Sequence, residues 1–296
     1  MYALKVEHAI ERIPGLADKG AKVAHAIHTA VLSSGDGLRK VADILHGTWL
    51  GHPLHPVLTD IPIGAWTVAM MCDLVAAQRG SPETEKMADA LVAIGAIAAV
   101  PTALAGIADY SAIDESALSL GAAHGLLNSA GLILNALSIR DRATGNRERG
   151  VMLSTVAFGL LNVSAWIGGD MVYNRKIGVN HIKEPGGPER WQTAIASGDL
   201  PEHTPKRIEV AGAPVLLFRD GMSLYAIGAV CSHAGGPLDE GQFYDGCVEC
   251  PWHNSVFDLR DGSVVHGPAT YPEPAYDTRV RNDQIEIRLR PASAGA

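Results

Sequence analysis

Four apolar stretches dominate the hydrophobic pattern of this chain. They cover residues 57–77, 88–108, 118–138 and 151–168, and short charged segments separate them. Each stretch is long enough to cross a hydrocarbon layer of ~30 Å at ~1.5 Å per residue. A soluble four-helix bundle is the alternative, but its helices would repeat a polar face about every 3.6 residues, and the second stretch has almost none after Asp89. The pattern therefore predicts a four-helix transmembrane bundle.

The pattern changes on both sides of these stretches. Residues 16–46 repeat apolar positions at helical spacing with a break at 34–37. This predicts one or two amphipathic helices, which would lie at the membrane interface or pack against another part of the protein. Beyond the stretches, short runs predict strands of an antiparallel β domain. These runs are 207–210, 215–219, 224–227, 276–280 and 285–289.

The resulting fold class is multi-domain, with an α-helical four-helix transmembrane bundle followed by an all-β domain. A Pro- and Gly-rich segment at 178–190 indicates a linker between them. We expect an amphipathic helical N-terminal segment over 1–47, a transmembrane domain over 48–177 and a β domain over 191–292.

Composition and charge give no support to several classes of protein, such as nucleic-acid-binding proteins. The 296 residues are enough for about two domains, and the net charge of −8 gives no reason to expect nucleic acid as a partner. Four cysteines do not suggest a disulfide framework. Residues 1–12 are polar and mixed in charge, so no secretory signal peptide is predicted there.

A metal-binding pattern lies near the end of the chain. It reads Cys231-Ser-His233, then sixteen residues, then Cys250-Pro-Trp-His253. Two thiolates and two imidazoles in this order suit a [2Fe–2S] cluster in which the thiolates bind one iron and the imidazoles the other. Zinc is the alternative, because Cys247 and Cys250 also form a legitimate metal pair. The pattern favours iron, since each half of it carries one ligand of each kind.

The phrases CSHAGGPL, CPWHNSVFDL and GPA in this region resemble those of Rieske ferredoxin domains, over about residues 188–290. The resemblance implies that Cys231 and Cys250 bind the buried iron. It implies that His233 and His253 bind the outer iron at the tip of the domain. The residues expected around the cluster are Gly235, Ser255, Phe257 and Pro268.

Three residues depart from the pattern of the Rieske proteins that oxidise quinols. Gly236 and Trp252 stand where those relatives have two cysteines joined by a disulfide, and Phe257 stands where they have a tyrosine that donates to a ligand sulfur. Ser255, which can donate to a bridging sulfide, is kept. Because hydrogen bonds to sulfur raise the reduction potential, the missing tyrosine predicts a low-to-intermediate potential.

Polar residues of the apolar half form a second group of candidates. The motif LGHPLHP at 50–56, with HGLLN at 124–128, resembles a bacterial family of predicted four-helix membrane proteins without an assigned function, over about residues 45–180. Ionisable groups inside a membrane are functional candidates by default. His124 with His55 or His52 could ligate a b-type haem, or His55 and His124 could line a quinone pocket. Alternatively, these groups hydrogen-bond one another and close one end of the bundle.

Together these observations predict a membrane-anchored Rieske-type protein that carries single electrons between a donor and a membrane redox partner. One alternative is a quinone oxidoreductase or haem-containing electron-transfer enzyme that uses the bundle. Another is an iron–sulfur redox sensor. No nucleophile or general base accompanies the metal motif, which favours an electron-transfer component over a stand-alone catalyst. The donor and acceptor proteins are not identified by the sequence.

The predicted location is the bacterial inner (cytoplasmic) membrane, crossed several times. The distribution of Lys and Arg leans slightly toward an external β domain. The absence of an export signal and of the protective disulfide favours the opposite side. We therefore expect the Rieske domain to face the cytoplasm.

Overall fold

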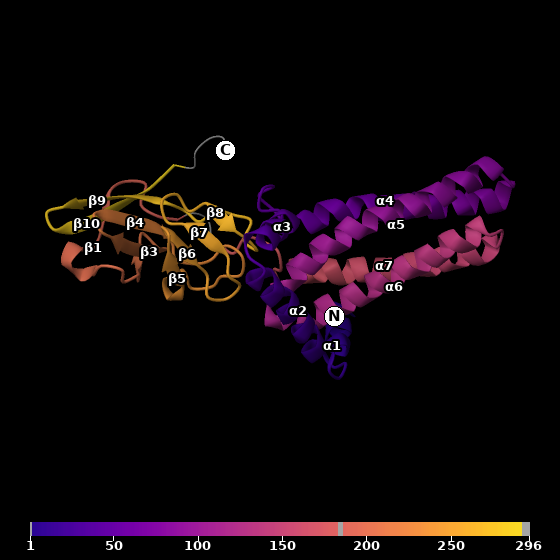
Figure 1. Cartoon of the computed structure of the whole chain (residues 1–296), viewed down its shortest axis with the longest axis horizontal. Helices are drawn as coiled ribbons and strands as arrows, with labels where there is room; N and C mark the ends of the chain where they lie inside the picture. The colour runs from indigo at the N-terminus through magenta and orange to yellow at the C-terminus, as the bar shows by residue number, and fades with distance from the viewer. Residues whose placement is uncertain (1, 183–185, 292–296) are drawn as a thin grey trace. The chain divides into compact units, whose positions relative to one another are not determined.

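The computed structural model describes residues 2–182 and 186–291. Residues 183–185 of the predicted linker and the predicted end of the β domain at 292 lie outside the described residues. The chain forms two compact units (Figure 1). The helical unit consists of Met1–Leu38 and Pro53–Ile177, and the β unit of Arg39–His52 and Gly178–Ala296. Residues 39–52 thus group with the β unit, although they precede the transmembrane helices in sequence.

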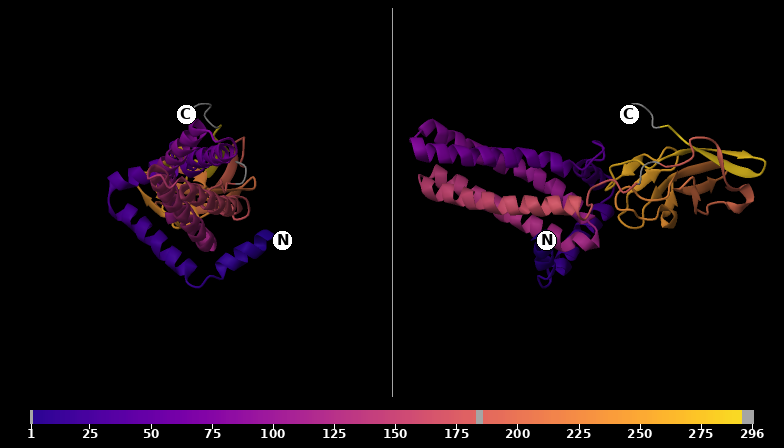
Figure 2. Two further views of the ribbon diagram at one scale, coloured as in Figure 1. Left: turned by 90° about the vertical axis from the view of Figure 1, so that its right-hand side faces the viewer. Right: turned by 180° about the vertical axis from the view of Figure 1, so that it is seen from behind.

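Four long helices run side by side in the helical unit (Figures 1 and 2). Their bounds are α4 Leu54–Arg79, α5 Pro82–Ser111, α6 Leu118–Ala143 and α7 Arg147–Tyr173. Each is long and apolar enough to cross a membrane, which confirms the four predicted spans. Each helix is longer than its apolar stretch, because polar residues at the ends continue the helix beyond the apolar core.

The turn between α4 and α5 shows how the sequence ends one helix and starts the next. Gly80 has a φ of 61° and its N–H donates to the carbonyl of Ala76, a left-handed cap that glycine adopts without strain. Ser81 then accepts the N–H of Thr84 at 3.3 Å, and Pro82 occupies the first position of α5. Serine and proline are preferred at these two positions because the first N–H groups of a helix have no partner within it.

Glycines inside the bundle make room for side chains from neighbouring helices. A Cβ on Gly95 would lie 2.4 Å from Nε1 of Trp66, whose N–H donates to the carbonyl of Val92 at 3.2 Å. A Cβ on Gly131 would lie 2.7 Å from Leu161. Small residues therefore let the helices pack closely, which is the main source of helix association in lipid.

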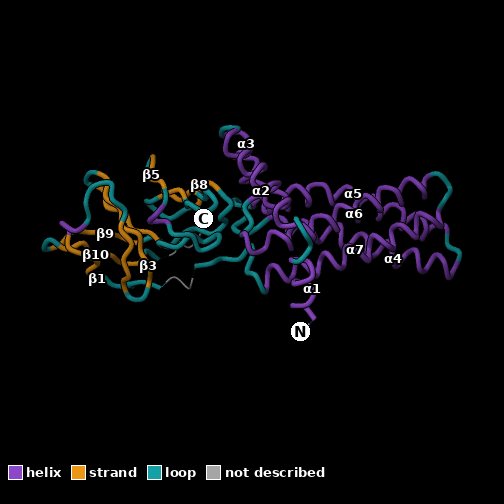
Figure 3. Tube along the Cα trace, turned by 90° about the horizontal axis from the view of Figure 1, so that it is seen from below, coloured by secondary structure: helices purple, strands orange, loops and turns teal. Residues whose placement is uncertain are grey.

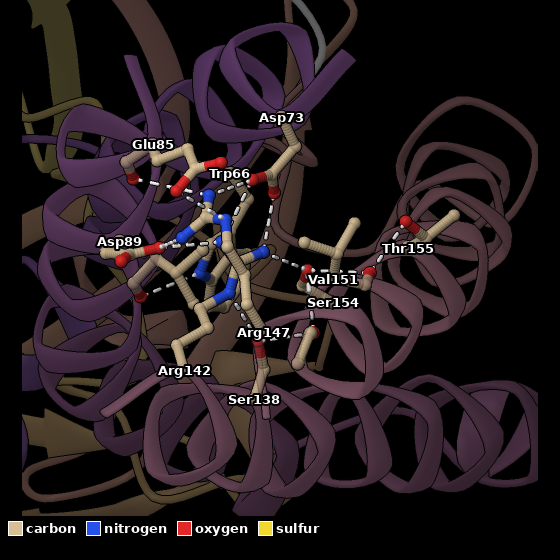
Figure 4. A network of polar contacts seen from close by, with 12 residues as sticks. Trp66, Asp73, Glu85, Asp89, Ser138, Arg142, Arg147, Val151, Ser154 and Thr155 are labelled. Carbon is tan, nitrogen blue, oxygen red and sulfur yellow. Dashed lines mark hydrogen bonds and ion pairs between the residues drawn. The ribbon is translucent and has the colours of Figure 1, made fainter. Parts of the chain in front are cut away.

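An ion network joins all four long helices near the α4–α5 and α6–α7 turns (Figure 4). Arg142 donates to Asp73 at 2.9 Å and to Asp89 at 2.8 Å, and its Nε donates to Ser138 at 3.0 Å. Arg147 donates to Asp73 at 2.8 Å and also to Asp89. The Arg142 side chain is only 2% exposed, so its buried positive charge needs the partners that the four helices supply.

Three shorter helices precede the bundle. They are α1 Tyr2–Glu11, α2 Leu16–Ser33 and α3 Asp36–His46. The last two match the predicted amphipathic helices and the break between them, and α1 lies within the 1–47 segment that was expected to be helical. Arg175, just after α7, donates to Glu7 and Glu11 of α1, both at 2.7 Å.

All the strands found in residues 2–182 and 186–291 lie in the β unit and form three antiparallel sheets (Figure 3). The first has the order β1-β10-β9, the second β2-β3-β4 and the third β5-β6-β7-β8. The strands of the first two sheets are β1 Gln192–Ala196, β2 Lys206–Val210, β3 Ala213–Asp220, β4 Ser223–Gly228, β9 Tyr276–Arg281 and β10 Gln284–Leu289. Those of the third are β5 Gln242–Tyr244, β6 Cys247–Glu249, β7 Val256–Asp258 and β8 Val264–His266.

The strands place two apolar clusters in the interior of the β unit. One includes Ile285 and Ile287 of β10 with Val215 of β3, all fully buried. The other contains Phe257 together with both Cys231 and Cys250. Short 3₁₀ turns at Glu115–Ala117, Ser197–Asp199 and Leu238–Glu240 complete the regular elements of the described chain. The predicted order of a helical bundle followed by an antiparallel β domain is confirmed.

Candidate metal centre

Two loops of the β unit share one backbone conformation. The first begins at Cys231, after β4. There the N–H of Cys231 donates to the carbonyl of Gly236, and the N–H of Gly235 donates back to the carbonyl of Cys231, both at 2.8 Å. The loop at Cys250, after β6, repeats both bonds at 2.8 and 3.1 Å. The equivalent residues Gly235 and Asn254 have φ values of 82° and 61°, a left-handed region that glycine and asparagine adopt most readily.

The four candidate ligands come together where these loops meet. Cys231 and Cys250 are each 1% exposed, and their thiols are within hydrogen-bonding contact. The rings of His233 and His253 lie 5.0 Å apart between centroids, at an interplanar angle of 83°. Buried sulfurs and neighbouring, partly exposed imidazoles thus form one donor set.

Backbone N–H groups point at both sulfurs. The sulfur of Cys250 accepts from the N–H groups of Trp252 and His253, and that of Cys231 accepts from the N–H of His233. Hydrogen bonding from the Cys231 thiol lowers the pKa of Cys250 to about 7, and the same contact and burial raise the pKa of Cys231. Oriented N–H groups of this kind stabilise negative charge on sulfur, which a thiolate metal ligand requires.

Trp252 and Gly236 occupy the two positions at which the quinol-oxidising Rieske proteins have disulfide-bonded cysteines. All four cysteines are free. A Cβ on Gly236 would lie 2.8 Å from the sulfur of Cys250 and 3.1 Å from the ring of Trp252. The indole therefore packs directly on Gly236, and the absence of a side chain there is a steric requirement of the loop pair.

A third loop contacts the candidate site through Ser255. The N–H of Ala269, which follows Pro268, donates to Oγ of Ser255 at 2.9 Å. Ser255 is completely buried, and this bond leaves its hydroxyl proton available for another acceptor. Phe257, on β7, is also completely buried and packs in the same core as the two cysteines.

Two residues far away in sequence hold these loops, and the sequence pattern did not single them out. Asp43 of α3 accepts from Nδ1 of His266 at 2.8 Å and from the N–H of Gly267 at 2.9 Å. Arg39 donates to the carbonyl of Asn254 at 3.1 Å. The second and third loops are thus connected to residues 39–52, which explains why that segment groups with the β unit.

Glu273 is a third residue that the sequence did not reveal. Its residue exposure is 3%, and Oε1 accepts the N–H of Ser232 at 2.7 Å, next to Cys231. Burial raises the pKa of Glu273 well above its ordinary value of 4.5. The role of Glu273 could not be recognised from the sequence, because its partner N–H belongs to a loop about forty residues earlier.

The structure also brings together the two histidines predicted in the bundle. His55 and His124 lie 6.2 Å apart between ring centroids and are nearly perpendicular. Nδ1 of His55 donates to the carbonyl of Thr102 at 2.8 Å, and Nδ1 of His124 donates to that of Ser164, also at 2.8 Å. Nε2 of His124 accepts from the amide of Asn128 at 2.9 Å.

Each of these imidazoles lies against a glycine on the neighbouring helix. A Cβ on Gly106 would lie 2.8 Å from His55, and a Cβ on Gly168 would lie 3.1 Å from His124. In both cases the glycine lies four residues after the residue whose carbonyl accepts the Nδ1–H of the histidine. The α4–α5 and α6–α7 hairpins therefore seat their histidines in the same way. His52, the other candidate, belongs to the β unit.

A pair of turns that brings two cysteines and two histidines together on an antiparallel β domain defines the Rieske class of iron–sulfur domain. Family models agree with this class. Residues 190–279 match the Rieske [2Fe-2S] domain, and residues 51–181 match a predicted membrane protein family (DUF2231). The predicted fusion of the two is confirmed.

Curated relatives cover the β unit. The anthranilate 1,2-dioxygenase ferredoxin subunit of Burkholderia cepacia is 34% identical over 99 residues, which is 33% of this chain and 92% of that protein. The 3-phenylpropionate/cinnamic acid dioxygenase ferredoxin subunit of Escherichia coli (strain K12) is 38% identical over 98 residues, 32% of this chain and 91% of its own length. The chain belongs to the Rieske ferredoxin family. Membership of this family supports the presence of a [2Fe–2S] cluster and a role as an electron carrier.

A solved structure is also similar. The ferredoxin of carbazole 1,9a-dioxygenase from Nocardioides aromaticivorans IC177 is 34% identical and matches 34% of this chain and 98% of its own, with a TM-score of 0.33.

Proposed function

We propose that this protein is a membrane-anchored Rieske ferredoxin that carries single electrons to a redox partner in the membrane. The observation that carries the proposal is the paired loops with two buried cysteines and two adjacent histidines, joined in one chain to four helices able to cross a membrane. Cys231 and Cys250 would hold one iron, and His233 and His253 the other. When bound, the cluster accepts and releases one electron.

The residues around the candidate site suit this role. N–H groups at both sulfurs and the available Ser255 hydroxyl would stabilise the charge added on reduction. Phe257 supplies no hydroxyl, which supports the low-to-intermediate potential. Trp252, 51% exposed, lies between two of the proposed ligands in sequence and offers an apolar contact surface to a partner.

The relatives suggest which kind of partner to expect. They are named as ferredoxin subunits of dioxygenases. By analogy, we propose an oxidoreductase in the membrane as acceptor and a soluble reductase as donor. The four cysteines form no disulfide, which suits a reducing compartment, and we therefore place the Rieske domain on the cytoplasmic side of a bacterial inner membrane.

The test is purification of the full chain in detergent or nanodiscs, followed by EPR of the reduced protein and a redox titration. A Rieske-type signal that is lost in Cys231→Ser and kept in Cys247→Ser would support the four-ligand assignment. Zinc in place of iron, or a signal that needs Cys247, would contradict it. Reduction by quinol without any added protein would favour a quinone oxidoreductase. If neither a donor nor an acceptor exchanges electrons with the reconstituted protein, the sensor alternative is favoured.

Sidedness has a separate test. A green fluorescent protein joined after residue 291 should fluoresce in cells if the β unit faces the cytoplasm. Alkaline phosphatase joined at the same place should then be inactive. Active phosphatase would place the β unit outside the cytoplasm.

A second candidate function, a haem site in the bundle, is favoured by the orientation of His55 and His124. Metal-ligating histidines generally donate their other ring N–H to a carbonyl or carboxylate, as both Nδ1 atoms do here. A ligand at Nε2 of His124 would have to replace Asn128. A Soret band in the purified protein, lost in His55→Ala and in His124→Ala but kept in His25→Ala, would support haem. A protein without that band would leave the pair as a structural contact between helices.

A further inference from the structure

Residues 39–49, here called the strap, present opposite kinds of side chain on two faces. One face contacts the loops of the candidate metal site through Arg39 and Asp43. On the same side, Ala42 is 7% exposed and His46 is 6% exposed. Arg39, Ala42, Asp43 and His46 therefore form the face of this segment that packs on the β unit.

The outward face of the strap is apolar. Val41 is 48% exposed, Ile44 56% and Trp49 64%. Val41 and Ile44 are three residues apart, so they are neighbours on one side of α3. Lys40, also exposed, flanks them. An amphipathic helix on a protein in water normally buries its apolar face, and here that arrangement is reversed.

Three observations indicate which partner covers this face. The strap leads directly into α4, because only four residues separate Trp49 from Leu54, a distance of at most ~18 Å. Within the helical unit, α4 exposes Val57 and Ile61 near its start, 46% and 53%, and α4 is one of the four candidate spans. Tryptophan and lysine are the residues that mark the edge of a bilayer, where an indole lies at headgroup depth and an ammonium reaches water.

We propose that the strap is an interfacial helix whose apolar face lies in the headgroup region of a lipid bilayer while its polar face clamps the loops of the candidate metal site. Such a helix binds through buried apolar area and through attraction of its basic residues to anionic lipids. The strap would thereby fix the β unit at the membrane surface through its own contacts, in addition to the covalent link. This proposal concerns lipid contact and holds whatever the cluster exchanges electrons with.

The experiment compares two exposed apolar positions of the β unit. A nitroxide label is placed at Ile44→Cys and, separately, at Val280→Cys, which is 50% exposed on β9, in a Cys72→Ser, Cys247→Ser background. The full chain is reconstituted in nanodiscs containing anionic lipid. Collision with oxygen, which concentrates in lipid, and with a water-soluble nickel chelate is then measured. The oxygen-to-nickel accessibility ratio should be severalfold higher at position 44 than at position 280.

Equal ratios at the two positions would overturn the proposal, since the strap would then face water. A label at position 44 that neither agent reaches would also overturn it, because another protein surface would be the occupant. The EPR signal of the reduced cluster in each labelled variant shows that the β unit is folded. The effect of Cys231→Ser on the cluster signal tests only the proposed function, whereas the accessibility ratio tests only the lipid contact. The two proposals can therefore fail separately.

Discussion

The two units hold their polar groups in different ways. In the β unit, the candidate ligands lie on two short turns with the same hydrogen bonds, and each turn is determined by a few adjacent residues. In the helical unit, the ion network takes charged residues from all four long helices, and 69 positions separate Asp73 from Arg142. A short motif thus predicts a site where the backbone turn itself orients the ligands. A site made by helix packing leaves no comparable local pattern.

The largest effect should come from removing a charge of the ion network. Arg142→Ala would leave Asp89 and the buried Asp73 with Arg147 alone, which should destabilise the bundle by about 3 kcal/mol. Thermal unfolding in detergent, followed by circular dichroism at helical wavelengths, measures this. Arg149→Ala is the control: that side chain is 60% exposed, and its ion pair should contribute less than about 1 kcal/mol. Equal losses would show that burial does not distinguish the two pairs.

A methyl group added to the paired turns should have the next largest effect. Gly236→Ala places a Cβ 2.8 Å from the sulfur of Cys250 and 3.1 Å from Trp252, at a cost of about 1–3 kcal/mol. The measurement is the temperature at which the cluster absorbance is lost. Gly125→Ala in α6, where a Cβ meets nothing within 4 Å, should stabilise its helix by about 0.5–1 kcal/mol. A harmless Gly236→Ala would mean that the turns tolerate a side chain at this position.

A smaller change is expected in the reduction potential on removal of the Ser255 hydroxyl. Ser255→Ala deletes one hydrogen bond that would stabilise the reduced cluster, worth about 1 kcal/mol, which for one electron lowers the potential by roughly 40 mV. A redox titration followed by EPR measures the shift. Ser263→Ala, outside the three loops, is the control and should leave the potential unchanged. A potential unchanged by Ser255→Ala would exclude a bond from this hydroxyl to the cluster.

The smallest change should be confined to pH dependence. The pKa of Glu273 is raised by burial, so above pH 4.5 the folded protein keeps a proton that the unfolded chain has released. The wild type should therefore lose stability as the pH rises from 4.5 toward the folded pKa. Glu273→Gln keeps the contact with Ser232 and removes this loss. Denaturation midpoints at pH 5 and pH 8 should differ less in the variant, and an unchanged pH dependence would assign it to other groups.

Much of the fold follows from residue patterns that act over short distances. The four apolar stretches predicted α4–α7, because a helix that crosses lipid must be apolar over most of its length. The five predicted strands are present as β2, β3, β4, β9 and β10. The strands of the third sheet have only three residues each, too few for alternation to be recognised. They are defined by pairing with neighbours and could not be predicted locally.

The sequence by itself determined the chemistry of the candidate centre, because Cys231, His233, Cys250 and His253 lie on turns that their adjacent residues specify. It also determined which helices are long and apolar enough to cross a membrane, since that depends on composition along one segment. Only the tertiary structure decided that Asp43 holds the third loop, that Glu273 is buried beside Ser232, and that the strap turns its apolar face outward. These features depend on groups far apart in the chain, whose burial and pairing exist only after the chain has folded.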